Sequence, residues 1–503
     1  MPRSFASTCT AALLASLACG NNGPQPAAPG TCLAGSPDAG PVAFRTCAPP
    51  GSPKFVDGQT VGPSTAPSSA CVKPVSMAVS NYGVQKFCAN PVGTRLSFSV
   101  PPGTGSISIV SQAYTAQDSV TIDDAGVPNS VAPTSVVDSS GRSLLDTPYT
   151  ALEGEDAGIF YAGLSPSTGA MTFPDTSLLL DEVTKNGQLP AGTWSFNVDD
   201  LANDCRLFSN CKGGGSGGNY DVTVITKPTP PASGTIDIGI YLVETSGYTS
   251  ATATADAALP ATPMGRMIQT LETLLGRAGL CLGTVTFYGV PSWAQSAYST
   301  TIDADKTDPC STLNQMFANL SQPGNTMNLF LVASIISTSQ GGTSVVGIDG
   351  TIPGPSGVGG TIHSGAAVSI ANLGAPGAPM VNCTPGTFNF RSCGPDTVAY
   401  TAAHEAGHFL GLYHTTEALG NAFDPLVDTA RCPCSTCRPS TAPSTQLCGN
   451  DPAKSYQMSV ADCSASTTCG GADNLMFWIF GSASSGKLTA QQGQVMRSNP
   501  AVQ

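Results

Sequence analysis

Charged residues are scarce in this chain of 503 residues. They make up 11% of it, and 33 aspartates and glutamates outnumber 20 lysines and arginines, giving a net charge of −13. The basic residues form no stripe, so we expect no nucleic-acid partner. No apolar run reaches the roughly 18 residues that a membrane-spanning helix needs, so we expect no such helix. Histidine is rarer still, with four copies.

Glycine, proline and cysteine are plentiful by contrast, with 56, 41 and 18 copies. Many cysteines and few charges are typical of proteins outside the reducing cytosol. We therefore expect an exported protein, either extracellular or on the outer cell surface. The chain exceeds the usual size of one domain, so two domains are expected.

The first residues have the pattern of an export signal. Residues 1–18 carry a basic residue, Arg3, and then a modestly apolar stretch that ends in small residues before Cys19. Two alternatives stay open: free secretion after cleavage of the signal, and lipidation of Cys19, which would anchor the protein to a membrane. Ser16 departs from the leucine that is usual in a lipidation signal. Residues 19–70 are rich in Pro, Gly, Ala and Ser and cannot bury a core, so we expect a tether or a pro-segment there.

The cysteines predict disulfide bonds. When one cysteine in the signal and the candidate lipid anchor are set aside, 16 remain, an even number that favours pairing. Short spacings predict the pairs Cys205 with Cys211 and Cys383 with Cys393. The run Cys-Pro-Cys-Ser-Thr-Cys at 432–437 has two interpretations, disulfides or a second zinc site. We favour disulfides because thiols outside the cell are normally oxidised.

Residues 71–227 alternate polar and apolar residues over short segments such as 94–100 and 220–225. This period-two pattern predicts β-strands, and its repetition between turns predicts an all-β sandwich. The proline-rich residues 228–234 predict a stiff linker and a domain boundary. Residues 235–503 then alternate strand and helix patterns. The expected fold class is therefore multidomain, with an N-terminal all-β sandwich followed by an α/β domain.

Apolar residues in the second domain mark its main elements. Residues 263–279 carry them at helical spacing after a proline, which predicts an amphipathic helix with a buried stripe. Apolar runs predict strands over residues 236–243, 284–290 and 327–336. A final helix is expected over residues 488–497.

Residues 396–417 contain the candidate catalytic and metal-binding residues, in the pattern H-E-x-x-H-x-x-G-x-x-H. Asp396 is the expected N-cap of a helix, and Gly411 is its expected end. On that helix His404 and His408 lie on one face, where two imidazoles suit a tetrahedral zinc ion.

The other members of the pattern complete a catalytic site. A turn at Gly411 returns His414 as a third ligand and leaves the fourth position open to water, which marks catalytic rather than structural zinc. Glu405 follows the first ligand and can act on that water without binding the metal. Three of the four histidines thus fall in one motif. The fourth, His363, is expected to be an ordinary surface residue.

The eleven-residue pattern resembles that of the metzincin zinc endopeptidases. Met476 is similarly placed to the methionine of their Met-turn, which lies beneath the metal. Residues 411–414 and 424–429 are similar to segments of the pappalysin branch, although Ala430 stands where that branch often has proline. The similarity covers about residues 235–500.

This resemblance implies a secreted or surface-anchored zinc endopeptidase that acts on a protein or peptide substrate. One catalytic zinc ion is implied, with Glu405 as general base for a zinc-activated water. Residues 361–370 are implied to be the edge strand that pairs with an extended peptide. A structural calcium ion is also implied. Its contributors would be Glu417, Asp424, Asp428 and Thr429.

A non-catalytic surface adhesion protein with a degenerate protease domain remains the alternative function. Degenerate copies usually lose a ligand or the glutamate, whereas this chain keeps all four residues. We therefore favour the enzyme.

Overall fold

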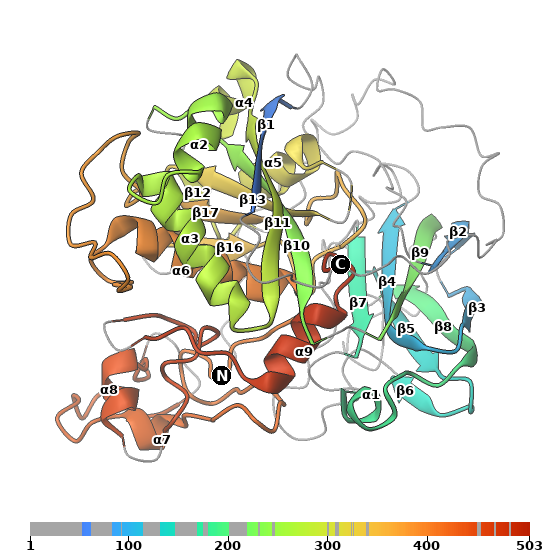
Figure 1. The fold of residues 1–503 in the computed structure, drawn as a ribbon. Coiled ribbons are helices and arrows are strands. Elements are labelled where there is room, and N and C mark those ends of the chain that lie inside the picture. The colour runs from blue at the N-terminus through green and yellow to red at the C-terminus, as the bar shows by residue number, and fades with distance from the viewer. Residues whose placement is uncertain are drawn as a thin grey trace, which may run out of the picture.

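The computed structural model describes residues 53–61, 83–91, 93–113, 131–145, 168–174, 180–200, 219–229, 232–243, 247–298, 301–306, 311–322, 324, 326–338, 342–449, 454–466, 469–481 and 484–503. They form a mixed α/β protein with several sheets. Figure 1 shows an all-β part beside a larger α/β part, with the last helix and the C-terminus where the two meet. The predicted signal, Cys19, and the pair Cys205 and Cys211 lie outside the described residues.

The all-β part contains two antiparallel sheets of four strands each. The first has the order β2 (Gly83–Pro91), β9 (Asn219–Pro228), β4 (Thr104–Ala113) and β7 (Thr168–Phe173). The second has the order β3 (Arg95–Val100), β8 (Gly192–Asp200), β5 (Val131–Val137) and β6 (Ser143–Leu145). One short helix, α1 (Leu180–Asn186), accompanies them.

Side chains from both sheets share one core. Phe98 and Trp194 of the second sheet and Phe173 of the first belong to one buried cluster, and Phe173 meets Trp194 edge-on. The period-two pattern causes this arrangement, because alternate residues of each strand face inward, as the burial of β3 shows. The sandwich expected from the sequence is therefore present in the described part of the chain.

The α/β part is organised around a six-stranded sheet. Its order is β1 (Lys54–Thr60), β11 (Leu280–Gly289), β10 (Gly234–Leu242), β13 (Thr326–Val332), β17 (Ala366–Ser369) and β16 (Gly347–Asp349). Neighbouring strands run parallel except for β16, which is antiparallel to β17. A smaller sheet has the order β12 (Ile302–Asp303), β14 (Ile335–Ser337) and β15 (Thr343–Val345).

Helices cover both faces of the large sheet. On one face, α2 (Ser250–Ala257), α3 (Pro263–Gly276) and α6 (Gly394–Phe409) share a core with Ile238 and Ile240 of β10. On the other, α4 (Ser292–Tyr298) and α5 (Thr312–Leu320) pack with Tyr241 and Phe330. Both faces of the parallel strands are thus buried, which explains their nearly continuous apolar runs. The apolar stripe predicted for α3 is buried as expected.

Two predictions about strands were incomplete or wrong. Residues 54–60, inside the segment predicted as a tether or pro-segment, form β1 at one edge of the large sheet. The opposite edge is β16, whereas residues 361–370 contain β17, an interior strand. The predicted peptide-binding edge is therefore wrong. A three-residue strand that starts at a glycine has no periodicity that the sequence could reveal.

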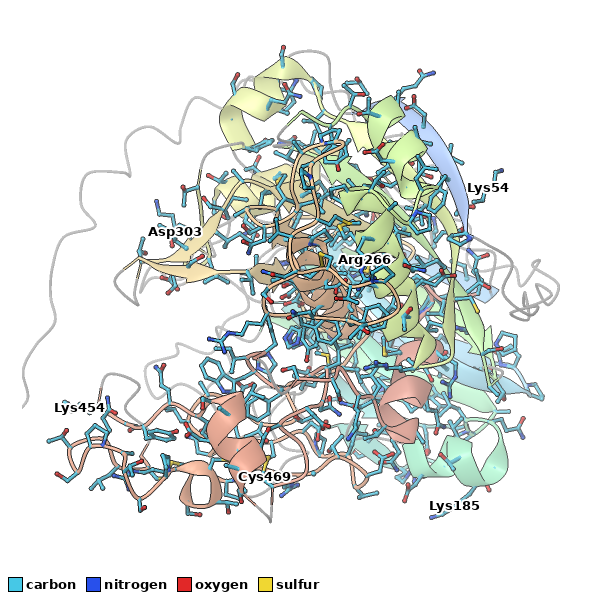
Figure 2. All side chains as sticks on the ribbon, turned by 60° about the vertical axis from the view of Figure 1, so that its left-hand side comes forward. Lys54, Lys185, Arg266, Asp303, Lys454 and Cys469 are labelled. Atoms are coloured by element: carbon cyan, nitrogen blue, oxygen red, sulfur yellow. A yellow bond between two sulfur atoms is a disulfide. The ribbon has the colours of Figure 1, made fainter. Side chains whose placement is uncertain are left out.

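The remaining helices belong to the cysteine-rich region and the C-terminal end: α7 (Cys434–Cys437), α8 (Val460–Ala465) and α9 (Ala490–Ser498). The predicted pair Cys383–Cys393 is confirmed. The cysteines of the 432–437 run pair with Cys469, Cys448 and Cys463, so the disulfide interpretation of that run is borne out. Figure 2 shows Cys469 in this lower region. No helix among the described residues is long and apolar enough to cross a membrane.

Candidate metal centre

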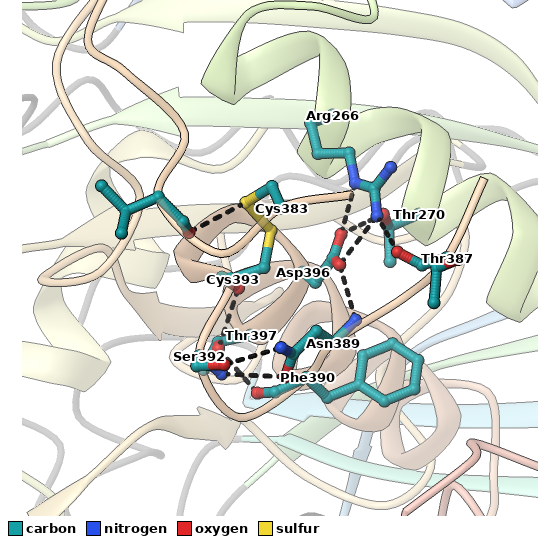
Figure 3. The surroundings of a disulfide bond; sticks show 11 residues. Arg266, Thr270, Cys383, Thr387, Asn389, Phe390, Ser392, Cys393, Asp396 and Thr397 are labelled. Carbon is teal, nitrogen blue, oxygen red and sulfur yellow. Dashed lines mark hydrogen bonds and ion pairs between the residues drawn. A yellow bond between two sulfur atoms is a disulfide. The ribbon is translucent and has the colours of Figure 1, made fainter. Parts of the chain in front are cut away.

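Helix α6 positions two of the three motif histidines. It begins after Cys393, and Pro395 occupies its second position, where a missing N–H costs no hydrogen bond. Asp396 is therefore not the N-cap, and that prediction is wrong. Its carboxylate instead accepts hydrogen bonds from Arg266, Thr270 and the backbone N–H of Asn389, as Figure 3 shows.

The turn after α6 brings the third histidine back. Gly411 has a φ of 106°, in a region that side chains rarely adopt, so glycine ends the helix and reverses the chain. The Nε2 atoms of His404 and His408 are 3.1 Å apart. Each lies 3.2 Å from Nε2 of His414. Donor atoms held tetrahedrally about 2.05 Å from zinc are about 3.3 Å apart, so the three nitrogens have the spacing of a metal site.

Each histidine is oriented by the nitrogen that faces away from this centre. His404 Nδ1 lies 2.7 Å from the carbonyl oxygen of Leu475, and His408 Nδ1 lies 2.7 Å from that of Leu412. Carbonyl oxygens only accept hydrogen bonds, so both Nδ1 atoms carry the proton. The Nε2 lone pairs are consequently free and point to a common centre, as in metal-bound histidines.

The third histidine differs from the others because its acceptor is a carboxylate. Nδ1 of His414 lies 3.0 Å from both oxygens of Glu417. This carboxylate–histidine arrangement fixes the orientation of the ring, as outer groups do for metal-bound histidines.

Burial keeps the first two histidines neutral. Desolvation, and then the neighbouring His414, lower the pKa of His404 from 6.5 to about 3. Desolvation likewise holds the pKa of His408 well below its usual value. Nitrogen lone pairs that converge in this way repel one another, and a bound cation removes that repulsion. His404, His408 and His414 therefore form a candidate metal-binding group.

Glu405 directly follows the candidate ligand His404, and its side chain lies against the edge strand β16. Its side chain is buried, and a Cβ added at Gly347 would lie 2.5 Å from its Oε1 atom. The carboxylate accepts the backbone N–H of Asp349. Desolvation, and then the Asp349 carboxylate, raise the pKa of Glu405 well above its usual value.

Asp349 is a site residue that the sequence did not reveal. Burial raises its pKa from 3.8 to about 7, while His414 acts in the opposite direction. Its Oδ2 atom is buried and has no hydrogen-bond partner among the described residues. The signal in the sequence is only an acidic residue followed by Gly350, a combination that is common in turns.

Met476, the predicted Met-turn residue, packs against the helix that carries His404 and His408. A Cβ on Gly407, between the two helical ligands, would overlap its Sδ atom. The turn around it is closed by a hydrogen bond from Phe477 N to Asn474 O. Its neighbour Leu475 supplies the carbonyl that orients His404.

The residues implied for calcium do not gather into one metal-binding group among the described residues. Glu417 contacts His414, as described above. Thr429 donates a hydrogen bond to Asp424, and Asp428 accepts one from the backbone of Gln491. These contacts do not bring the four residues to one common centre.

His363 lies apart from the motif histidines. It is buried, contrary to the expected surface position, and burial lowers its pKa to about 4. Its Nδ1 atom bonds to the carbonyl of Gly350. The sulfur atoms of Cys432, Cys437 and Cys469 also gather closely, but all three take part in the disulfides described above.

A scan against protein-family models and a search of the curated proteins found no match to this chain.

Proposed function

We propose that this protein is an exported zinc-dependent endopeptidase of the metzincin type, most similar to the pappalysin branch. The convergence of three oriented imidazole Nε2 atoms, with Glu405 directly after the first of these histidines, supports this function above all. Three protein nitrogens leave one tetrahedral position open, as in catalytic rather than structural zinc sites. The disulfide-bonded cysteines are consistent with an extracellular protein.

Zinc bound to these nitrogens would supply a Lewis acid that polarises a carbonyl and acidifies a water molecule. The chain's own residues supply the rest. Glu405 accepts a proton from the attacking water at its carboxylate and returns it to the leaving amine. The hydrogen bond from the backbone of Asp349 holds that carboxylate beside the edge strand.

Strand β16 supports a peptide as the substrate. It forms the edge of the large sheet and, among the described residues, pairs only with β17. An extended peptide can add to such an edge through backbone hydrogen bonds, largely independent of its sequence. Since Gly347 of this strand touches Glu405, a peptide bound along β16 passes next to the proposed base.

The test measures metal content and cleavage of casein or gelatin by the mature protein and two variants. We expect one zinc per wild-type chain and cleavage that stops when zinc is chelated. Glu405→Ala should keep zinc and lose about 10²–10⁴-fold in activity, because only the base is removed. His408→Ala should lose both zinc and activity.

The two variants separate the proposal from its alternative. An active Glu405→Ala protein would refute the mechanism. Zinc without cleavage of any protein or peptide would favour the non-catalytic binding protein with a degenerate protease domain.

A further inference from the structure

The β-sandwich contacts the chain next to one metal ligand. Tyr413 directly precedes His414, and its buried side chain belongs to the hydrophobic cluster of the sandwich, together with Phe98 and Trp194. Its hydroxyl donates a hydrogen bond to the carbonyl oxygen of Ile352, 3.3 Å away, and Ile352 packs on the same cluster. The loop that carries His414 therefore packs against the sandwich.

A second contact joins the sandwich to the C-terminal end of the chain. Lys227, at the end of β9, is 1% exposed, and its Nζ atom donates hydrogen bonds to three backbone carbonyls. The acceptors are Arg497 O at 2.5 Å, Asn499 O at 3.0 Å and Val502 O at 2.5 Å. The amino group of Lys227 thus lies at the C-terminal end of α9, where backbone carbonyls accept hydrogen bonds from side chains.

The C-terminal segment in turn holds the end of the metal-site helix. The side chain of Asn499 donates a hydrogen bond from Nδ2 to the carbonyl oxygen of Phe409, 3.2 Å away. Phe409 is the last residue of α6 and follows His408. Lys227 thus connects through Asn499 to the helix that carries His404 and His408.

Further contacts show that the interface is continuous. Ser106 Oγ of β4 donates to the carbonyl oxygen of Ser498, 2.6 Å away in the interior. Val358, from the loop between β16 and β17, packs with Val110 and Ala170 of the sandwich. Leu180 of α1 belongs to the core of the α/β part.

From these contacts we infer that the β-sandwich is a scaffold of the metal centre and not a separable accessory module, with Tyr413 and Lys227 as positioning residues for the histidine ligands. This inference rests on the proposed metal site. The Nε2 atoms lie within 3.1–3.2 Å of one another, so a small shift of the His414 loop takes one donor out of reach. Substitution of a residue that orients a metal ligand without binding the metal typically weakens metal affinity by about 10–100-fold.

The experiment compares four variants of the full chain with wild type. Zinc affinity is measured by competition with a chromogenic chelator, and ligand geometry by the visible absorption of the cobalt(II)-substituted protein. Tyr413→Ala should bind zinc about 10–100-fold more weakly and show an altered cobalt spectrum. Tyr413→Phe keeps the ring in the sandwich core and should restore most of the affinity.

Two further variants separate positioning from general instability. Val136→Ala shortens a buried side chain on β5, in the sheet that contributes neither Lys227 nor Ser106, and should leave zinc affinity within about twofold of wild type. Lys227→Met keeps the unbranched side chain up to its ε position but removes the amino group and its three hydrogen bonds. It should weaken zinc binding even if Tyr413→Ala fails to fold.

The outcomes distinguish this inference from the proposed function. Wild-type zinc affinity and an unchanged cobalt spectrum in Tyr413→Ala or Lys227→Met would overturn the inference, even for an active peptidase. An equal loss of affinity in Val136→Ala would also overturn it. A loss of zinc affinity confined to the Tyr413→Ala and Lys227→Met variants would support the inference, even if the wild-type protein binds zinc and cleaves no peptide.

Discussion

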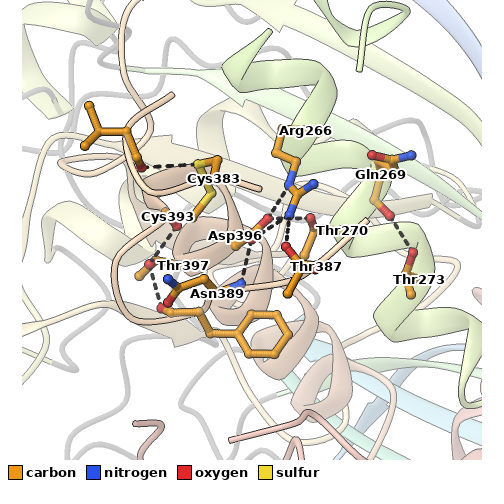
Figure 4. A network of polar contacts seen from close by, with 12 residues as sticks. Arg266, Gln269, Thr270, Thr273, Cys383, Thr387, Asn389, Cys393, Asp396 and Thr397 are labelled. Atoms are coloured by element: carbon orange, nitrogen blue, oxygen red, sulfur yellow. Dashed lines mark hydrogen bonds and ion pairs between the residues drawn. A yellow bond between two sulfur atoms is a disulfide. The ribbon is translucent and has the colours of Figure 1, made fainter. Parts of the chain in front are cut away.

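The guanidinium group of Arg266 and the carboxylate of Asp396 form two hydrogen bonds in the interior, at 2.7 and 2.9 Å. Arg266 lies on α3 and Asp396 in the first turn of α6, so the pair joins the helix that carries the metal ligands to the neighbouring helix. Thr270 donates a third hydrogen bond to the same carboxylate, and Figure 4 shows the network. The side chains are 5% and 0% exposed.

Breaking this pair should destabilise the protein strongly. Arg266→Met leaves the Asp396 carboxylate buried without its counter-charge, a change that typically costs about 3–5 kcal/mol. Denaturant unfolding measures the difference. Lys185→Met serves as control, because its ion pair with Asp181 is exposed and should contribute at most about 1 kcal/mol. Equal effects of the two substitutions would contradict this assignment.

Asp424 should give the protein a specific pH dependence. Burial is the main cause that raises the pKa of its carboxyl group from 3.8 to about 7; the hydrogen bond from Thr429 opposes the shift, and the charge of Asp428 adds to it. Between about pH 4 and 7 the folded state holds a proton that the unfolded state releases, so this group's contribution to stability falls as pH rises.

The substitution Asp424→Asn isolates that contribution, because asparagine has no proton to lose. The free energy of unfolding of the variant, minus that of wild type, should rise by up to about 4 kcal/mol between pH 4 and pH 8. Denaturant titrations in the presence of a chelator at several pH values measure this. A difference between the two proteins that does not change with pH would contradict the prediction.

The roles of residues whose partners lie close by in the sequence were predictable. The three histidines lie within eleven residues, and helix periodicity together with one glycine brings them together. The strands of the sandwich and the buried stripe of α3 follow from the same kind of short-range pattern. The pair Cys383–Cys393 closes a short loop and was predictable for the same reason.

The roles of residues whose partners lie far away in the sequence were not predictable. Asp349 approaches Glu405 because β16 is placed at the sheet edge by its pairing with β17. Asp396 caps no helix because Arg266, 130 residues away, binds its carboxylate instead. The role of Lys227 depends on carbonyls about 270 residues further along the chain. No local pattern encodes such partners.

Gly347 should be required for activity but not for metal binding. A Cβ at this position would lie 2.5 Å from both Glu405 Oε1 and Thr401 Cγ2, so Gly347→Ala should push the carboxyl group out of place. We expect at least a tenfold fall in kcat/KM, about 1.4 kcal/mol, with unchanged zinc content. Gly276→Ala is the matched control, because among the described residues no atom outside its own helical turn lies within 4 Å of its Cβ position. A fully active Gly347→Ala enzyme would contradict the proposed role of this contact.

Glu417 should control how tightly the third ligand binds metal. It is the only carboxylate that contacts a motif histidine through Nδ1 among the described residues, and the other two rings use backbone carbonyls that substitution cannot remove. Glu417→Ala should therefore weaken zinc binding by about 10–100-fold, because the ring of His414 loses its acceptor and its orientation. Glu417→Gln keeps a carbonyl oxygen that can accept the Nδ1 proton, so it should retain an affinity between those of wild type and Glu417→Ala. Chelator competition gives the three affinities, and isothermal calorimetry checks them. If all three proteins bind zinc equally, the ring of His414 is held by the packing of its neighbours alone, and the carboxylate has no part in it.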